Sequence, residues 1–498
     1  MNIKSKTKKA LPYSVGISLL KMLVALFGMV LLIRYLNAEQ YSVYALLAGL
    51  PMLLNIFLSM GYDQYLLRYL PKLQDKKEIG EMVWNIIFWR MLTVIGASLL
   101  LVLTFPLYAD KFGLDGYYLH FAIYQVGILG SIGHLFFEKV FNSRFQQKIL
   151  MFARTFYEIS RFGVILIGIQ LEKELVFFVI GLAVSEVGFM LILSVVFLKS
   201  YGLVSLLSVV KVRIENKEEK NYRWGSYFEK FGASFLGTDI DRYLLAYFST
   251  NVQVAIYAVA TKTLTKLLTF YPNRMFNLVS EAALFSKYDQ NENDKDLNKI
   301  FSFLYNANNI VAFLFLALFI SQGREMLDFV FENDYVKQAY WPLVIFLCFL
   351  IFYSVPLTLI ARAIKRPKIL VYSKLSFIIN IAIGIPLAQN YGATGMALAT
   401  SGSVVIQNAI VYILINQTNK LYIPWMSTIK CMVISATTIA VLELSGGLVD
   451  SLFVNLTIGV LVYLFLFKIT RILNEYEAKL FLSLVPKKLV GVASFFIK

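Results

Sequence analysis

Apolar runs of about twenty residues recur along this sequence, and they restrict its fold more than any other feature. Of 498 residues, 58% are apolar and only 16% are charged. A helix of about twenty residues crosses the ~30 Å hydrocarbon core of a bilayer. Inside that core each backbone N–H and C=O group needs a partner within the protein, which a helix supplies by itself. The chain is therefore predicted to be an all-α polytopic membrane protein.

Fourteen candidate spans can be placed by length and composition. Eleven of them are long and strongly apolar: 12–33, 41–60, 84–107, 117–137, 175–198, 301–320, 341–360, 369–388, 394–415, 424–444 and 452–467. Three weaker candidates, 152–169, 224–248 and 252–276, carry charged residues. The sequence thus predicts about 14 transmembrane helices.

The distribution of Lys and Arg gives the orientation, because cytoplasmic loops of membrane proteins are enriched in both residues. With the N-terminus inside, the predicted outside loops hold only five such residues, Arg34, Lys111, Lys173, Arg324 and Lys337. Dropping span 152–169 would invert every later loop and destroy this asymmetry. Removing 224–248 and 252–276 together would preserve it, so a cytoplasmic insertion there stays open. We expect a multi-pass protein of the cytoplasmic (inner) membrane with both termini in the cytoplasm.

Several function classes are disfavoured by composition. The net charge of +16 is interpreted as a topology signal and not as a nucleic-acid surface. Cys348 and Cys431 lie inside apolar runs, and the two histidines, His120 and His134, are too few for a dedicated zinc site. The outside loops are short, which leaves no room for an extracytoplasmic catalytic domain. We therefore expect no enzyme, no cofactor and no metal, and no nucleic acid among the partners.

A weak internal repeat relates the two halves of the chain. Gln40, Val43, Tyr44 and Ala45 open one span, and the similar set Gln253, Ile256, Tyr257 and Ala258 opens another, at an offset of 213 residues. Related halves are the sequence trace of transporter architecture. The offset predicts two six-helix lobes followed by two further helices.

Five short stretches combine small, acidic and aromatic residues: RYLNAEQYSVY (34–44), GYDQYLLR (61–68), GTDIDRYLL (237–245), VAIYA (254–258) and YGATGMALA (391–399). With these stretches the sequence resembles polysaccharide flippases, namely the Wzx-type O-antigen and exopolysaccharide repeat-unit translocases of the multidrug/oligosaccharidyl-lipid/polysaccharide exporter superfamily. The resemblance covers nearly the whole chain. It departs at Ser42, where the family often has Gly.

The resemblance implies a MATE-like V-shaped architecture with a central cavity. The spans and the internal repeat divide the chain into an N-lobe of helices 1–6 (1–200), a C-lobe of helices 7–12 (201–420) and helices 13 and 14 (421–470). The helical spacing of apolar residues after Arg471 predicts a cytoplasmic amphipathic tail (471–498), which either lies on the inner leaflet or is solvated. The implied activity is flipping of a polyprenyl-diphosphate-linked oligosaccharide for lipopolysaccharide or exopolysaccharide biosynthesis. Membrane lipid and other polysaccharide-assembly proteins are the further partners expected.

Cations at mid-membrane depth are the candidate substrate residues. Lys21 and Lys262 each lie ~14–15 Å along their predicted spans, at 1.5 Å per residue, and Lys266 follows one turn later. Lys262, Lys266, Thr269, Asn273, Asn277 and Ser280 recur at steps of three and four, which aligns them on one helical face. Lys21, Lys262, Lys266 and Arg274 are predicted to bind a phosphate group in a cavity. Lateral packing, with Arg274 snorkelling to the surface, is the alternative.

Intramembrane carboxylates form the second set of candidates, because such groups are costly in lipid and normally find a partner. Asp239, Asp241 and Arg242 are interpreted as an ion pair or a coupling site. Glu186 either pairs with Arg161 or Arg90 or titrates during transport. The end of the second span carries Asp63 and Arg68, for which a local ion pair competes with a gate.

Other functions stay open at this point. A multidrug or small-metabolite antiporter of the same superfamily is one alternative, although two midplane lysines suit a cationic drug poorly. A flippase of the lipid-linked peptidoglycan precursor is another. A membrane glycosyltransferase or polymerase lacks the large soluble segment expected of it, and a purely structural protein does not account for the polar face.

Overall fold

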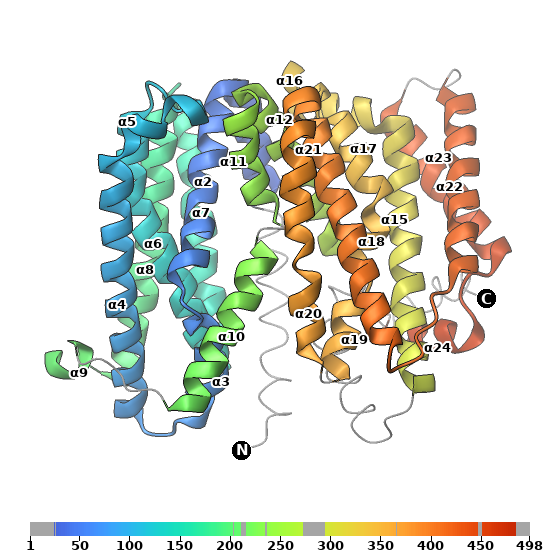
Figure 1. Ribbon diagram of the computed structural model, residues 1–498. Helices are drawn as coiled ribbons and strands as arrows, with labels where there is room; N and C mark the ends of the chain where they lie inside the picture. The colour runs from blue at the N-terminus through green and yellow to red at the C-terminus, as the bar shows by residue number, and fades with distance from the viewer. Residues whose placement is uncertain are drawn as a thin grey trace. The chain divides into compact units, whose positions relative to one another are not determined.

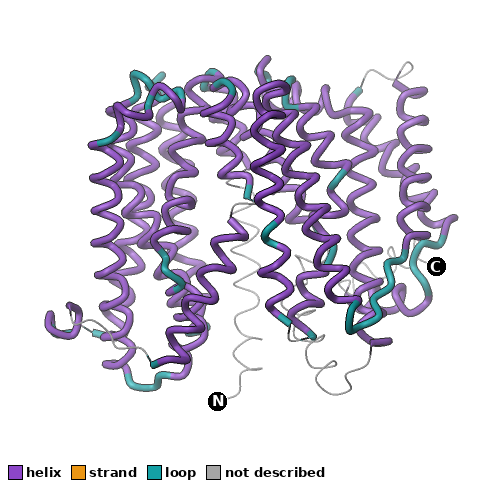
Figure 2. Tube along the Cα trace, viewed as in Figure 1, coloured by secondary structure: helices purple, strands orange, loops and turns teal. Residues whose placement is uncertain are grey.

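The computed structural model describes residues 24, 26–202, 204–210, 216–234, 237–271, 294–364, 366–446 and 451–484. Within these ranges every regular element is a helix (Figure 2). The prediction of an all-α membrane protein is confirmed. Eight helices are long and apolar enough to cross a bilayer, and a ninth candidate is a bent pair of helices.

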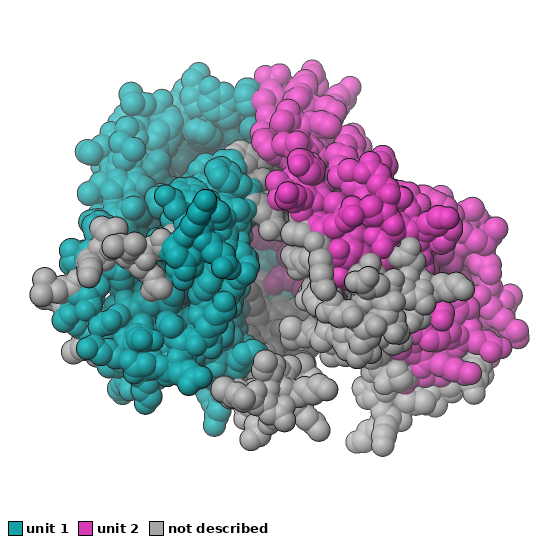
Figure 3. All heavy atoms as spheres, turned by 60° about the horizontal axis from the view of Figure 1, so that its bottom comes forward, with its two compact units in different colours: residues 1–255 teal, residues 256–498 magenta. Residues whose placement is uncertain are grey.

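The chain divides into two compact units, Met1–Ala255 and Ile256–Lys498 (Figure 3). The division falls inside helix α12, Asn251–Leu267. Each unit builds its own apolar clusters. The division into lobes at residues 200 and 420 and the repeat behind it stay predictions.

Unit 1 is an up-and-down bundle (Figure 1). Its longer helices are α2 (Ala38–Leu58), α4 (Lys76–Leu103), α6 (Tyr118–Ser143), α7 (Gln147–Gln170), α8 (Leu175–Tyr201) and α10 (Lys217–Ser234). Its shorter elements are α3 (Tyr62–Tyr69), η1 (Leu70–Lys72), α5 (Phe105–Tyr108), η2 (Asp110–Phe112), α9 (Leu206–Val210) and α11 (Thr238–Phe248). Asn37 begins α2 with a capping box, in which its side chain accepts from the Gln40 amide at 2.9 Å.

Glycines bring α6 and α8 into close contact. A Cβ added at Gly130 would lie 2.4 Å from the Val187 backbone nitrogen, and one at Gly127 would lie 2.9 Å from the Ala183 Cα. Small residues at such spacing let two helix backbones approach within a membrane. The side chains that follow on these faces are therefore held at fixed positions.

Unit 2 contains the rest of the helices. They are η3 (Leu268–Phe270), α15 (Asp294–Phe331), α16 (Asp334–Lys337), α17 (Tyr340–Cys348), α18 (Leu350–Ser354), α19 (Leu357–Ala363), α20 (Pro367–Ser373), α21 (Ser376–Asn416), α22 (Trp425–Gly446), α23 (Leu452–Thr470) and α24 (Glu475–Leu484). Ten of the fourteen predicted spans match a long described helix or part of one: 41–60, 84–107, 117–137, 152–169, 175–198, 301–320, 369–388, 394–415, 424–444 and 452–467.

Prolines interrupt two of the predicted spans. The span predicted at 341–360 is divided into α17, α18 and α19. It bends by 62° at Phe349, between Asp334–Cys348 and Leu350–Ala361, and it breaks again at Val355, which is extended before Pro356. The span predicted at 252–276 leaves the helix after Phe270, because Tyr271 precedes Pro272 and is extended (φ −70°, ψ 133°). A residue before proline is sterically pushed out of the α region.

A third predicted span, 224–248, is also interrupted. It is divided between α10, which ends at Ser234, and α11, which begins at Thr238.

α21 is a helical hairpin and not one straight helix. Gly392 has φ 55° and ψ −133°, and a Cβ added at Gly395 would lie 2.0 Å from the Leu387 carbonyl oxygen. Ser403 donates to the Asn380 side chain at 3.4 Å, although the two residues are 23 positions apart. The chain therefore reverses at Gly392, as the separate spans 369–388 and 394–415 require.

The C-terminal helix α24 packs on unit 2 itself. Leu480 and Phe481 contact the cluster of α15, α19 and α21 side chains that includes Phe301 and Ile360. That this part of the tail also lies on the inner leaflet stays a prediction. Lys487 and Lys488, which follow α24, lie outside the described residues.

Candidate functional sites in the spanning helices

Residues 254–261 of α12 are buried on every side, and in its last turns the helix presents two unlike faces. Tyr257, Thr261 and Leu264 are buried, and the Tyr257 hydroxyl lies 3.3 Å from the Thr400 hydroxyl of α21. Their spacing of three and four places them on one side of the helix. Lys262 and Lys266 lie away from this side and are half-buried. Two of the four predicted phosphate-binding cations thus occupy the more accessible face of one helix.

The other two predicted cations, Lys21 and Arg274, lie outside the described residues. The same holds for Asn273, Asn277 and Ser280 of the predicted polar face. Within the described part of the chain that face ends at Thr269, which is exposed.

Asp63 holds three helices of unit 1 together. Its Oδ1 accepts from Arg90 of α4 at 2.7 Å, and its Oδ2 accepts from Lys230 of α10. Arg90 also donates to the Asn55 side chain of α2. The carboxylate side chain is 5% exposed and the guanidinium 2%. A buried ion pair of this kind is destabilising to break, because the remaining charge stays in a low-dielectric surrounding.

The local pairing considered for Asp63 and Arg68 is therefore wrong. Arg68 instead contacts Glu218 of α10 at 3.5 Å, with side chains 44% and 77% exposed. Asp63 and Arg68 are five positions apart in α3, so they point to different sides of the helix. Both residues nevertheless join α3 to α10, which the Tyr65 hydroxyl also does by donating to Glu219 at 3.1 Å.

α11 carries the predicted ion pair. Arg242 contacts Asp239 at 3.0 Å, one turn away. Asp241 is fully buried, and Tyr243 donates to the Leu46 carbonyl oxygen of α2 at 2.6 Å. These contacts fasten α11 to α2 within unit 1.

A chain of ionisable side chains runs through α6, α7 and α8. His134 Nε2 lies 2.5 Å from Glu186 Oε2, and the Tyr157 hydroxyl donates to Glu186 Oε1 at 2.9 Å. His134 Nδ1 lies 3.8 Å from Glu138, which accepts from Arg154. His134 and Glu186 are each 6% exposed. Glu186 thus contacts a histidine and a tyrosine, whereas Arg90 contacts Asp63.

Arg161, the other partner considered for Glu186, donates to the Tyr44 hydroxyl of α2 at 3.3 Å. Its charge acts on Glu186 at longer range. The contacts of α7 explain how its charges are tolerated: Arg154 and Arg161 both turn toward neighbouring helices.

Sequence reasoning missed the role of His134 and Tyr157. We considered His134 only as a zinc ligand. The informative pattern is the spacing of Gly127, Gly130 and Gly133, directly before His134. Small residues every third position mark a face that packs tightly on another helix, so a histidine beside them meets a helix and not lipid.

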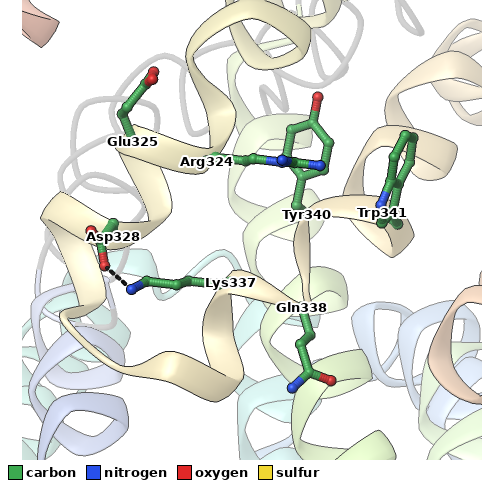
Figure 4. A pocket seen from close by; sticks show the side chains of 7 residues that line it. All are labelled: Arg324, Glu325, Asp328, Lys337, Gln338, Tyr340 and Trp341. Atoms are coloured by element: carbon green, nitrogen blue, oxygen red, sulfur yellow. Dashed lines mark ion pairs between the residues drawn. The ribbon is translucent and has the colours of Figure 1, made fainter.

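A pocket of about 410 Å³ lies at the end of α15 that adjoins α16 and α17 (Figure 4). Arg324 stacks over the Tyr340 ring at 4.9 Å, and Lys337 contacts Asp328 at 3.2 Å and Asp334 at 3.1 Å. Its lining holds two cations and two carboxylates. The charges balance, so the pocket does not favour an anion. Among the described residues no His, Cys, Asp and Glu cluster could hold a metal ion.

The fold is that of a multi-pass helical membrane protein. The chain is similar to the solved "Lipid II flippase MurJ, inward closed conformation", with a TM-score of 0.66 and 15% identity over 92% of this chain and 98% of that one. It is also similar to an inward-facing "multidrug resistance MATE family transporter of the MOP superfamily", with a TM-score of 0.57 and 11% identity over 80% and 95% of the two chains.

The family follows from the sequence itself. Residues 8–274 match the model of the polysaccharide biosynthesis protein family, and the chain belongs to that family. No curated protein matches the sequence.

Proposed function

We propose that this protein flips a polyprenyl-diphosphate-linked oligosaccharide across the cytoplasmic membrane for cell-surface polysaccharide biosynthesis. The family is one of polysaccharide biosynthesis proteins, and the fold is shared with a lipid II flippase and a MATE transporter. Such a cargo has an anionic diphosphate, a polar glycan and a long apolar tail. Its diphosphate needs cations within the membrane-spanning part of the protein. Its tail needs an opening between helices, so that it can stay in the lipid.

The accessible face of α12 is the observation that carries this proposal. Lys262 and Lys266 are one turn apart and are presented away from the helix side that is packed on α21. A Lys ammonium binds phosphate as a point charge without demanding a fixed geometry, which suits a group that must be captured and released. Lys21 and Arg274 are proposed to complete the phosphate site, and alternating access is proposed to move the headgroup.

Two further sets of residues are proposed to hold the transporter together. Asp239, Asp241 and Arg242 fasten α11, and Asp63 and Arg68 bind α10 to α3 and form the candidate gate. Lys230 supports the gate proposal. Its side chain is partly exposed, and it contacts the buried carboxylate of Asp63.

Deletion of the gene tests the proposal directly. The expected result is accumulation of lipid-linked glycan in the cytoplasmic leaflet, and complementation by the unaltered chain. Lys262→Ala and Lys21→Ala are expected to fail in complementation at normal expression, whereas Thr265→Ala on the same helix is expected to succeed. Full complementation by both lysine variants would remove the phosphate site, and transport of a cationic drug would favour the antiporter instead.

A further inference from the structure

We infer that His134 and Glu186 form a buried proton-binding site in unit 1, and that its proton is coupled to transport. The first reason is the order of charges along the contacts: Arg154, Glu138, His134 and Glu186. With an imidazolium at His134 the signs alternate and the set is neutral. With a neutral imidazole, Glu138 keeps Arg154 beside it, but buried Glu186 keeps only the longer-range charge of Arg161, and a carboxylate without a close counter-charge is expensive in a bilayer.

The geometry of the ring gives the second reason. Both ring nitrogens face carboxylates, Nε2 at 2.5 Å from Glu186 and Nδ1 at 3.8 Å from Glu138. A neutral imidazole carries one proton and one lone pair, so one nitrogen would direct its lone pair at a carboxylate. An imidazolium donates from Nε2 to Glu186 and presents an N–H, instead of a lone pair, to Glu138. Nδ1 has no hydrogen-bond partner within range among the described residues, since Glu138 lies 3.8 Å away.

In the described part of the chain, the other charged groups near this pair come from α7, and Arg161 acts on Glu186 at longer range. α7 contributes Tyr157, which donates to Glu186, together with Arg161 and the buried Glu158, whose charges are opposite. α2 contributes Tyr44, which accepts from Arg161. Arg90 of α4 lies over the Phe136 ring and contacts Asp63. Lys139 lies 140° from His134 around α6, since each residue turns the helix by about 100°.

Glu138 gives the proton a way out. Its side chain is 14% exposed, compared with 8% for His134 and Glu186. Release passes the Nδ1 proton to the Glu138 carboxylate once the 3.8 Å separation shortens to hydrogen-bond distance, and then to water, and it leaves a neutral imidazole donating from Nε2 to Glu186. Uptake reverses these steps. Glycines of α6 pack closely against α8. A change of charge at His134 therefore acts on rigidly packed helices and not on mobile side chains.

The sequence makes a sharp test possible, because it contains only two histidines. The full chain is labelled with ring ¹⁵N-histidine in lipid nanodiscs, and His120→Gln assigns the two sets of signals. At pH 7.5 a histidine in water is mostly neutral. The expected result is the imidazolium signature at His134, its conversion to neutral imidazole in Glu186→Gln, and its retention in Tyr157→Phe.

A neutral His134 in the unaltered chain at pH 7.5 overturns the proton-binding site. The protonation state is measured on the unaltered chain, and His120→Gln serves only to assign its signals. An imidazolium that persists in Glu186→Gln overturns the pairing. The transport arm rests on the proposed function: His134→Gln and Glu186→Gln are expected to accumulate lipid-linked glycan in the deletion strain, and normal complementation by both overturns the coupling. If deletion itself causes no accumulation, the proposed function fails while the histidine spectrum still decides the proton site.

Discussion

The two units treat intramembrane charge in opposite ways. In unit 1, Asp63, Arg90 and Glu186 lie inside the bundle and each contacts a polar partner from another helix. In unit 2, residues 256–261 of α12 are buried on every side, and Lys262 and Lys266 in its last turns are half-buried. Charges buried inside a bundle fix the packing of helices, whereas half-buried cations can also be reached by a ligand. The difference separates structural charges from candidate binding charges.

Loss of a matched charge is expected to have the largest effect. Asp63→Asn leaves Arg90 buried beside Asn55 without a counter-charge, so the free energy of unfolding is expected to fall by about 3–5 kcal/mol. Glu218→Gln, which alters the exposed contact to Arg68, is the matched control and is expected to cost less than about 1 kcal/mol. Equal unfolding curves for the two variants in detergent would contradict the comparison.

Close packing around the matched charges is expected to be the next most sensitive feature. Gly130→Ala places a Cβ 2.4 Å from the Val187 backbone nitrogen, and backbone cannot rotate away. Overpacking of this kind costs about 1–3 kcal/mol, and the thermal unfolding midpoint is expected to fall. Gly163→Ala is the control, because nothing lies within 4 Å of its added Cβ. A Gly130→Ala protein as stable as the control would show that α6 and α8 are less tightly packed.

How much of the fold and of the candidate sites the sequence predicted depends on how far apart the interacting residues lie along the chain. Apolar runs located the long helices, because bilayer thickness alone sets their length. The helix breaks before Pro272 and Pro356 were missed, because hydropathy values do not record how a proline restricts the backbone of the residue before it. Partners were the hardest to predict. For Asp239, Asp241 and Arg242 the sequence offered an ion pair or a coupling site, and the contact of Asp239 with Arg242 lies within one helical turn. The partner of Glu186 was missed because His134 is 52 positions away in the sequence.

A buried carboxylate in unit 2 gives a smaller effect that depends on pH. Glu477 of α24 is 1% exposed and accepts from the Asn306 side chain at 3.0 Å, and burial raises its pKa. The folded protein therefore keeps a proton that the unfolded chain has already lost. Stability is expected to fall as pH rises from the ordinary pKa of a glutamate through the raised value.

Glu477→Gln tests this dependence. It preserves an acceptor for Asn306 but carries no charge, so its unfolding midpoint is expected to stay level across the same pH range in which the unaltered chain loses stability. Glu475→Gln, on the same helix and exposed, is the control. Identical pH profiles for Glu477→Gln and the unaltered chain would show that another group is responsible.

The smallest effect on stability is expected where the effect on transport is largest. Lys262→Ala removes a half-buried cation from the accessible face of α12 and leaves the buried face with Tyr257 and Thr261 in place. The free energy of unfolding is expected to change by less than about 1 kcal/mol, while complementation of the deletion strain is lost. Lys262→Arg keeps the charge and is expected to restore part of it. If Lys262→Ala instead unfolds the protein as Asp63→Asn does, then Lys262 belongs with the matched charges, and the contrast between the two units no longer marks a binding face.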